Sequence, residues 1–235
     1  VIDDYEMKIT HIIRGEDHLS NTPKHILLQE ALNFPRPLYA HIPLILGPDR
    51  TKLSKRRGAV PVKDYKAEGY LPEALINFIA FLGWNPGDNR EIFTLKDLIK
   101  EFGLERVQKS GAIFNSEKLD WLNGYYIRQM PIDKLTEMCI LYLKKLRIAD
   151  YELWIKKIIK LEQPRLKKLS EIGELTDFFF KDKLEYDKEL LRWKDMAGSQ
   201  ILDSLKTSLS FVEKINAGDF NAKNLERILM PEAGK

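Results

Sequence analysis

A short basic segment is the first place where residue types and spacing could do chemistry. Residues 50–57 hold five basic side chains and no acidic one. Within them, Lys52, Ser54 and Lys55 place two ammonium groups around a hydroxyl. Two such lysines can reach one polyphosphate and follow its charge as a leaving group departs. We interpret the segment as an anion-binding loop; the alternative is a solvated basic turn.

The spacing of the histidines argues against a metal site. They stand at positions 11, 18, 25 and 41, with Glu16 and Asp17 directly before His18. There is no H-x-x-x-H pair and no second cysteine, so no zinc knuckle can form. The phosphate-binding patterns G-x-x-x-x-G-K-[ST] and G-x-G-x-x-G are also absent. We expect no protein-bound metal, zinc included.

Length and composition indicate a globular protein with one large domain or two modest ones. The 235 residues are 44% hydrophobic, and no apolar stretch approaches the roughly 20 residues of a spanning helix. The net charge of +3 is too balanced to identify a polyanionic partner by itself. Cys139, the single cysteine, is expected in a core in a reducing compartment. No signal peptide is visible, and the start at Val1 suggests a trimmed chain.

The elements that would carry the basic loop are a helix before it and a short apolar run. Thr22 and Pro23 favour a helix with threonine as the N-cap, ending near Asn33. The run Pro43–Leu46 favours a buried strand or turn.

Two further helices are expected after the loop. One begins at Leu71-Pro72 and should end with Gly83 as a left-handed cap. Thr94 and Asp97 approximate a capping box for a short helix that Gly103 closes. The apolar face of the first of these helices would comprise Leu75, Phe78, Ile79 and Leu82.

Helical periodicity dominates from Pro131 onward, and we place a boundary near Arg128. We therefore expect a predominantly α, multi-domain chain. The apolar positions at helical spacing are Leu135, Met138, Leu141, Tyr142 and Leu146, then Ile201, Leu205, Leu209, Val212 and Ile215.

Several segments together resemble glutamyl-tRNA synthetase, a class I aminoacyl-tRNA synthetase. They are Ile12–Pro23, His41–Asp49, Lys52–Arg56, Glu68–Leu75, Leu82–Trp84 and Glu117–Gly124. The resemblance implies three parts. Residues 1–18 would end a Rossmann-type α/β catalytic domain, and 19–128 would be a stem-contact region with a KMSKS-type loop at 52–56. Residues 129–235 would form an all-α anticodon-binding region that is incomplete at its C-terminus.

The resemblance also implies an active site for glutamate and ATP. Lys52, Ser54 and Lys55 would be catalytic, and Lys55 would contact the ATP phosphates. Further ATP-site positions would be Asp17, His18, Ile45 and Leu46, the last two as an apolar adenine wall. Mg²⁺ would enter with ATP.

Arg14 matches the arginine that binds the side chain of the substrate glutamate. A guanidinium offers a bidentate fork that fits a carboxylate better than an amide. The alternative is a structural ion pair with Glu16 or Asp17.

The same resemblance implies four tRNA-binding residues. Lys118, Trp121 and Arg128 belong to the stem-facing part, and Arg165 would face the third base of the anticodon. A guanidinium can read a base edge or stack on its face. The alternative for Arg165 is an ordinary arginine on a helix surface.

The family's H-I-G-H signature is missing, because His11-Ile12-Ile13-Arg14 lacks its glycine and second histidine. We therefore expect glutamate–tRNA ligation, through a glutamyl-adenylate, from a longer enzyme, and tRNA binding without catalysis from this chain. The alternatives are a glutaminyl-tRNA synthetase and a non-catalytic tRNA-binding module. The expected partners are glutamate tRNA, glutamate and ATP, without a membrane; the expected state is a cytoplasmic monomer.

Overall fold

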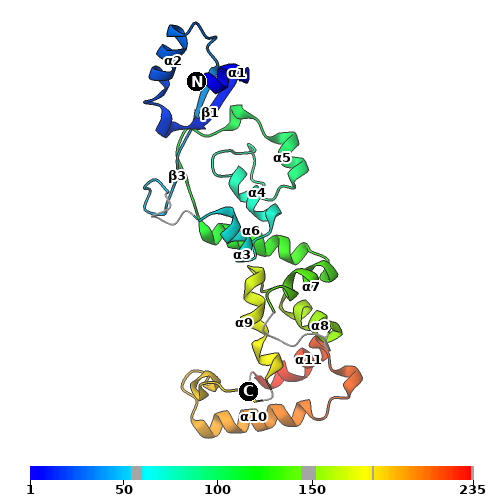
Figure 1. Ribbon diagram of the computed structural model, residues 1–235. Helices are drawn as coiled ribbons and strands as arrows, with labels where there is room; N and C mark the ends of the chain where they lie inside the picture. The colour runs from blue at the N-terminus through cyan, green and yellow to red at the C-terminus, as the bar shows by residue number, and fades with distance from the viewer. Residues whose placement is uncertain (54–59, 144–151, 182, 234–235) are drawn as a thin grey trace. The chain divides into compact units, whose positions relative to one another are not determined.

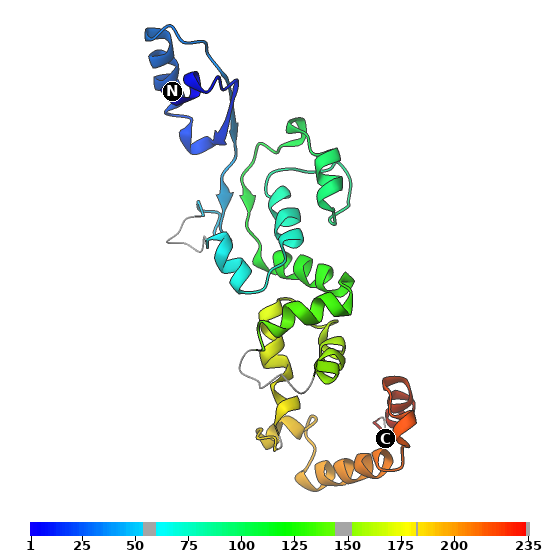
Figure 2. The same cartoon turned by 45° about the vertical axis from the view of Figure 1, so that its right-hand side comes forward.

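The computed structural model describes residues 1–53, 60–143, 152–181 and 183–233. It contains two compact units, Val1–Phe180 and Lys181–Lys235. Both are mainly helical (Figures 1 and 2), as predicted. The boundaries that we expect at residues 18 and 128 stay predictions.

A strand–helix–strand unit lies near the N-terminus. Strands β1 (His11–Gly15) and β2 (Leu38–Ile42) are parallel, and Arg14 pairs in register with His41. Helix α2 (Thr22–Ala31) connects the two strands and lies beside them (Figure 1). Helix α1 (Ile2–Glu6), which precedes β1, also lies beside this unit. Parallel strands joined by a helix are typical of an α/β domain.

We predicted that Thr22 is the N-cap of α2, but the structure places it as the first residue of this helix. Asn21 occupies the N-cap position, and Pro23 lies in the first turn. The threonine hydroxyl is engaged by groups outside the helix, which the active site explains below.

A second parallel pair, β3 (Ile45–Leu46) with β4 (Ala112–Ile113), follows. The apolar run is thus a strand, as predicted. It is not fully buried, because 38% of Ile45 is exposed.

The helices between and after these strands pack against one another in pairs rather than around one central helix. They are α3 (Val62–Ala67), α4 (Pro72–Ala80), α5 (Leu95–Glu101), α6 (Ser116–Gln129), α7 (Ile132–Ile140), α8 (Glu152–Glu162) and α9 (Ile172–Thr176). Short 3-10 turns are η1 (Glu16–His18), η2 (Leu104–Arg106), η4 (Leu169–Glu171) and η5 (Asp177–Phe180). The predicted capping box is present, since Thr94 and Asp97 bond each other's backbone N–H groups.

The end of α4 differs from the prediction. Phe81 follows the helix in a right-handed conformation, and Gly83 has no positive φ, so it is not a left-handed cap. The carbonyl of Gly83 instead accepts a hydrogen bond from Gln108 N at 2.6 Å. This bond ties the glycine to the segment after η2.

Asn77, rather than the predicted Ile79, lies on the buried face of α4. Ile79 is 50% exposed, whereas Asn77 is 0% exposed. The Asn77 amide accepts from Phe93 N (2.7 Å) and Tyr126 Oη (2.9 Å) and donates to Glu91 O (3.0 Å). A buried amide with these partners fixes the loop before α5. A pattern of apolar residues cannot reveal such a buried polar side chain.

The main core lies where α6, α7, α8 and η4 meet. Cys139 is fully buried there, as predicted, and burial raises the pKa of its thiol to about 12. Its buried neighbours in the cluster include Ile127, Leu135, Ile159 and Leu166.

Asn123 joins three segments inside this core. It is 0% exposed; its Oδ1 accepts from Leu71 N at 2.8 Å, and its Nδ2 donates to Lys167 O at 2.5 Å. Gly69 adopts a φ of +86°, and a Cβ there would lie 2.6 Å from Leu169 N. The segment before α4 is therefore packed directly against the segment after α8.

Replacing Asn123 with alanine should lower the free energy of unfolding by about 2–6 kcal/mol. Leu71 N and Lys167 O would lose their side-chain partner inside the core, and each unsatisfied group costs about 1–3 kcal/mol. Urea unfolding checks the value, with exposed Asn89→Ala as the control. Equal stability of the two variants would contradict the assigned role of Asn123.

The second unit contains η6 (Lys188–Leu191), α10 (Gly198–Val212), η7 (Ala217–Asp219) and α11 (Ala222–Ala233). The predicted periodic segment thus forms α10, although Ile215 lies beyond its end. Leu146 lies outside the described residues. In the described part of the chain after Pro131 there are helices and no strand. No helix among the described residues could cross a membrane.

Candidate active site

The guanidinium of Arg14 is held at the carboxyl end of β1 by uncharged groups. Its Nη2 donates to Thr22 Oγ1 at 2.8 Å, and its Nη1 lies 3.3 Å from His25 Nδ1. The Tyr39 ring lies beneath it, with its centroid 5.4 Å from Cζ. Arg14 Nε is buried and has no hydrogen-bond partner among the described residues. The arginine is thus oriented, yet one donor is unused.

The structural ion pair that we weighed for Arg14 is not present among the described residues. Glu16 Oε1 accepts from Leu44 N at 3.1 Å, and Asp17 Oδ2 bonds Lys52 Nζ at 2.6 Å. Both candidate carboxylates therefore have other partners. Within the part of the chain that the structure describes, no carboxylate forms an ion pair with Arg14, and the Asp17 carboxylate pairs with Lys52 instead.

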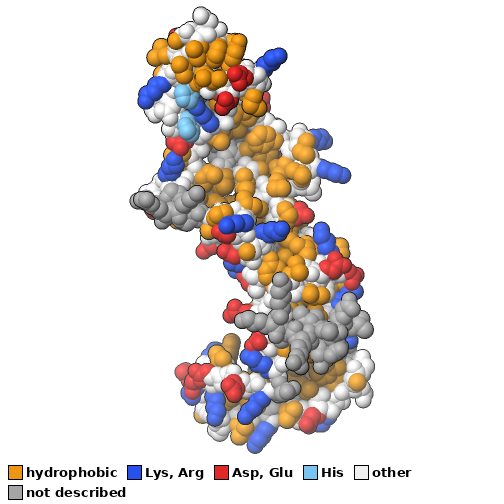
Figure 3. All heavy atoms as spheres, in the orientation of Figure 1, with side chains coloured by type: hydrophobic (Ala, Val, Ile, Leu, Met, Phe, Trp, Pro, Cys, Tyr) orange, Lys and Arg blue, Asp and Glu red, His pale blue; other side chains and the backbone are white. Residues whose placement is uncertain are grey.

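Thr22 links the parts of this cluster. Its Oγ1 accepts from Arg14 and lies 2.9 Å from His41 Nε2 and 3.1 Å from His18 O. Figure 3 shows histidine side chains beside basic ones on this part of the surface. Sequence reasoning missed Thr22, His25, Tyr39 and His41 as a group, because it weighed His25 and His41 only as metal ligands. The signal available was their place on the helix and strand that flank Arg14.

His25 is suited to accept a hydrogen bond from Arg14. Burial, and then the charge of Arg14, lower the pKa of His25 below its ordinary value of 6.5. The ring is therefore neutral at neutral pH, so one of its nitrogens is free of a proton.

The predicted ATP-side residues lie together beside β3. Leu46 forms an antiparallel bridge with Lys52, and Leu53 N donates to Ile45 O at 2.9 Å. Lys52 in turn reaches Asp17 on η1, next to His18. The partly exposed apolar strand β3, Lys52 and the acidic turn η1 are therefore neighbours in the structure. Ser54 and Lys55 lie outside the described residues.

Replacing Lys52 with methionine should raise the pKa of Asp17. The hydrogen bond from Lys52 is the main reason that this pKa lies below its ordinary value of 3.8. Lys52 stabilises the charged carboxylate, so its removal should favour the proton. A carboxyl NMR titration measures the change, and an unchanged pKa would show that the Lys52–Asp17 bond does not form in solution.

Lys118, Trp121 and Arg128 lie along one stripe of α6, at spacings of three and seven residues. Trp121 is 45% exposed, and the Tyr125 ring extends the stripe at a centroid distance of 6.4 Å. Lys118 Nζ pairs with Glu91 Oε1 at 2.6 Å, so its charge is partly neutralised. Exposed aromatic and basic side chains on one face are suited to RNA.

Arg165 lies in the turn after α8, and 75% of its side chain is exposed. Its Nη1 is 3.7 Å from Glu162 Oε1. This exposure leaves the guanidinium accessible to a partner molecule.

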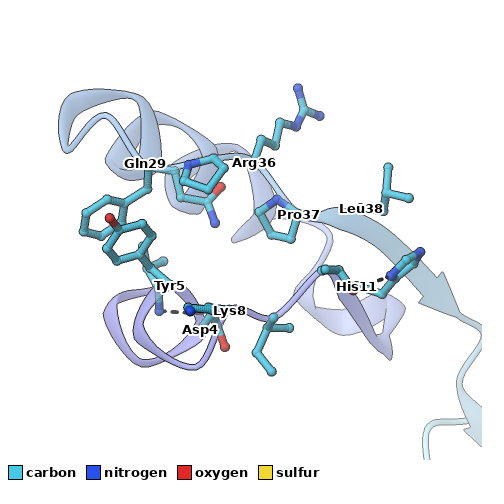
Figure 4. Close-up of a pocket in the computed structure, with 13 residues that line it drawn as sticks. Asp4, Tyr5, Lys8, His11, Gln29, Arg36, Pro37 and Leu38 are labelled. Carbon is cyan, nitrogen blue, oxygen red and sulfur yellow. Dashed lines mark hydrogen bonds and ion pairs between the residues drawn. The ribbon is translucent and has the colours of Figure 1, made fainter.

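Two other features bear on the choice of site. Among the described residues, no group of three or more His, Cys, Asp or Glu side chains could hold a metal ion. A cavity of about 450 Å³ lies between α1, α2 and the first residues of β1 and β2 (Figure 4), and none of the predicted site residues lines it. In Figure 4 the Arg36 side chain points away from this cavity. We assign it no role.

Two family models match the chain. That of the catalytic domain of the class I tRNA synthetases (E and Q) covers residues 1–121, and an anticodon-binding domain model covers residues 134–234.

Individual relatives agree with these models. The chain is 44% identical to glutamate–tRNA ligase 1 of Caldanaerobacter subterraneus, over 100% of this chain and 49% of that protein. It is also 44% identical to the glutamate–tRNA ligase of Dehalococcoides mccartyi, with the same coverage. The crystal structure of the Elizabethkingia meningosepticum glutamate tRNA ligase, in complex with its amino acid, superposes with a TM-score of 0.77 at 33% identity. That match covers 99% of this chain and 49% of that one. The chain thus spans about half the length of the relatives it matches.

Proposed function

Since the chain belongs to the class I tRNA synthetases for glutamate and glutamine, we propose that it is part of a glutamate–tRNA ligase. The longer enzyme would join the glutamate α-carboxylate to the α-phosphorus of ATP and release pyrophosphate. The terminal adenosine of glutamate tRNA would then take the glutamyl group and release AMP. This chain alone, which lacks an H-x-G-H motif, would bind tRNA without catalysing either step.

The environment of Arg14 is the observation that carries the choice of glutamate. Thr22 and His25 fix two of its nitrogens, and Nε has no partner among the described residues. A guanidinium with no neighbouring protein anion favours a carboxylate over the amide of glutamine. The carboxylate of the substrate side chain would supply the negative counter-charge that Arg14 lacks among the described residues.

ATP would lie along β3 and the turn that follows it. Ile45 and Leu46 would contact the adenine, Asp17 and His18 would line the adenosine side, and Lys52 would approach the phosphates with Ser54 and Lys55. Mg²⁺ would neutralise phosphate charge that these lysines do not reach. This proposal is supported by the contacts of Lys52, which bridges to Leu46 of β3 and pairs with Asp17 of η1.

Glutamate tRNA would contact the α6 stripe of Lys118, Trp121 and Arg128 and, at its anticodon, Arg165. We expect the protein to act as a monomer in the cytoplasm. The glutaminyl alternative is less favoured, because we expect a β-barrel in its anticodon region. Here the described residues after Pro131 form helices.

The isolated chain should bind glutamate tRNA in a salt-sensitive way and form no glutamyl-adenylate. Each phosphate contacted by a lysine or arginine releases counterions. The logarithm of the binding constant should therefore fall linearly with the logarithm of the salt concentration, with a slope of about 0.7–0.9 per phosphate contact. Filter binding over a salt series, with pyrophosphate exchange in parallel, measures both properties. Absence of tRNA binding would sink the proposal, while exchange by this chain would refute the non-catalytic part.

A further inference from the structure

A buried carboxylate lies directly beneath Arg165. Only 3% of the Glu162 side chain is exposed, and its Oε1 is 3.7 Å from Arg165 Nη1. Its other oxygen, Oε2, is buried without a hydrogen-bond partner among the described residues. A buried charge is costly unless a counter-ion compensates it. Among the described residues, Arg165 supplies a cation within ion-pair distance.

The backbone around this pair is held from several sides. Gln163 Nε2 donates to the carbonyls of Ile127 and Met130, each at 2.9 Å. The carbonyl of Glu162 accepts from Arg165 N at 2.9 Å and from Leu166 N at 3.1 Å. Leu166 is fully buried in the core. The turn is thus fixed on the end of α6, and the guanidinium direction is the remaining freedom.

We propose that Glu162 is a positioning residue that aims Arg165 at a base of the tRNA anticodon. This proposal rests on the proposed function, because it takes the anticodon loop as the ligand of Arg165. The carboxylate would restrain one side of the guanidinium at 3.7 Å, and 75% of the Arg165 side chain stays exposed to a ligand. A long side chain loses less entropy on binding when it is already ordered.

The charge of Glu162 also favours a base over a phosphate as the partner. A carboxylate beneath the guanidinium lowers the positive potential that would attract a phosphate. It leaves the outward hydrogen-bond donors unchanged, and a base edge needs donors in a fixed plane rather than net charge. A buried acid under an RNA-facing arginine is therefore a specificity device.

The test compares two stem-loop RNAs that carry the glutamate and the glutamine anticodon, which differ in the third base. Fluorescence anisotropy with the whole 235-residue chain gives the ratio of the two Kd values. One base-reading contact contributes about 5- to 150-fold discrimination, by analogy with duplex recognition. Arg165→Gln should remove this discrimination. Glu162→Gln, of the same size, should lower the ratio about fivefold or more, and the double variant should match Arg165→Gln.

Asp133→Asn is the matched control. Asp133, on α7, pairs with Lys156 of α8, which lies six residues before Glu162 on the same helix. It should leave the ratio unchanged. Should Glu162→Gln fail to fold by circular dichroism, Arg165→Lys keeps the charge and removes the fork, and it should lose discrimination while retaining affinity.

An unchanged ratio in Glu162→Gln, or retained discrimination in Arg165→Lys, would overturn the positioning role and leave the proposed function intact. Equal tightening of both RNAs in Glu162→Gln would assign Arg165 to a phosphate and also overturn it. If the unmodified chain binds neither RNA, the proposed function itself fails.

Discussion

Arg14→Ala, in a glutamate–tRNA ligase that contains this chain, should raise the glutamate concentration needed for adenylate formation by more than tenfold. Truncating one member of a buried charged pair costs about 2–5 kcal/mol, and each 1.36 kcal/mol is tenfold. The effect should appear in KM for glutamate, because we propose that Arg14 binds the substrate side chain and not the phosphates. ATP dependence should change little. Pyrophosphate exchange at varied glutamate measures both.

Arg90→Ala is the matched control for Arg14→Ala. Arg90 is an exposed arginine that pairs with Asp88 and Glu101, and its Nη2 lies 2.6 Å from Glu101 Oε2. It has ion-pair partners of its own, in contrast to Arg14, and no expected contact with substrate. An Arg14 variant whose glutamate dependence equals that of the Arg90 variant would return Arg14 to a structural role.

Lys52→Met should slow adenylate formation about 10²- to 10³-fold at saturating glutamate and ATP. The loss of one preorganised electrostatic contact to developing charge has this size, about 2.7–4 kcal/mol. Lys52 is bound to Asp17 in the structure, so the phosphates would either share the lysine with Asp17 or displace it. The expected change is therefore in kcat for exchange, with little change in the KM for glutamate.

Two variants separate catalysis from structure at Lys52. Lys63→Met removes an exposed lysine from α3 and should leave the rate unchanged. Asp17→Asn removes the partner of Lys52 without removing the ammonium group. Asp17 is itself proposed to line the adenosine side, so its own role should appear in the KM for ATP. If Asp17→Asn lowered kcat at saturating ATP as far as Lys52→Met does, Lys52 would act through its bond to Asp17 rather than on the phosphates.

Much of the fold followed from local patterns in the sequence. The resemblance to glutamyl-tRNA synthetase and the mainly helical architecture are confirmed by the family and structural matches. The capping box of Thr94 is confirmed because its bonds join residues three positions apart. Patterns of this kind need no knowledge of distant segments.

The errors arose where distant segments decide the structure. Gly83 has the residue type of a left-handed cap, but its carbonyl is bound by Gln108, far along the chain. Asn77 is buried because its amide bonds the backbone of Glu91 and Phe93. Apolar periodicity takes no account of such bonds, so it predicted Ile79 on the buried face. Thr22 has the residue type of an N-cap, yet its hydroxyl serves Arg14.

The candidate site was predicted as separate residues and not as an arrangement. The sequence suggested Arg14, Asp17, Ile45, Leu46 and Lys52. It did not suggest that Asp17 bonds Lys52, or that Thr22 and His25 hold the guanidinium of Arg14. Such contacts depend on how α2 packs beside β1 and on how the segment after β3 returns to η1, and they join residues 8, 11 and 35 positions apart. The roles of these residues stay predictions until the variants are measured.

The most direct test is competition among purified tRNAs for this chain, measured at a low and at a raised salt concentration. We expect unlabelled glutamate tRNA to displace labelled glutamate tRNA at a several-fold lower concentration than glutamine tRNA or an unrelated tRNA does. This preference should survive when the salt concentration rises, because base contacts discriminate whereas phosphate contacts weaken all RNAs alike. Equal displacement by all three tRNAs would contradict the assignment of this chain to a glutamate–tRNA ligase.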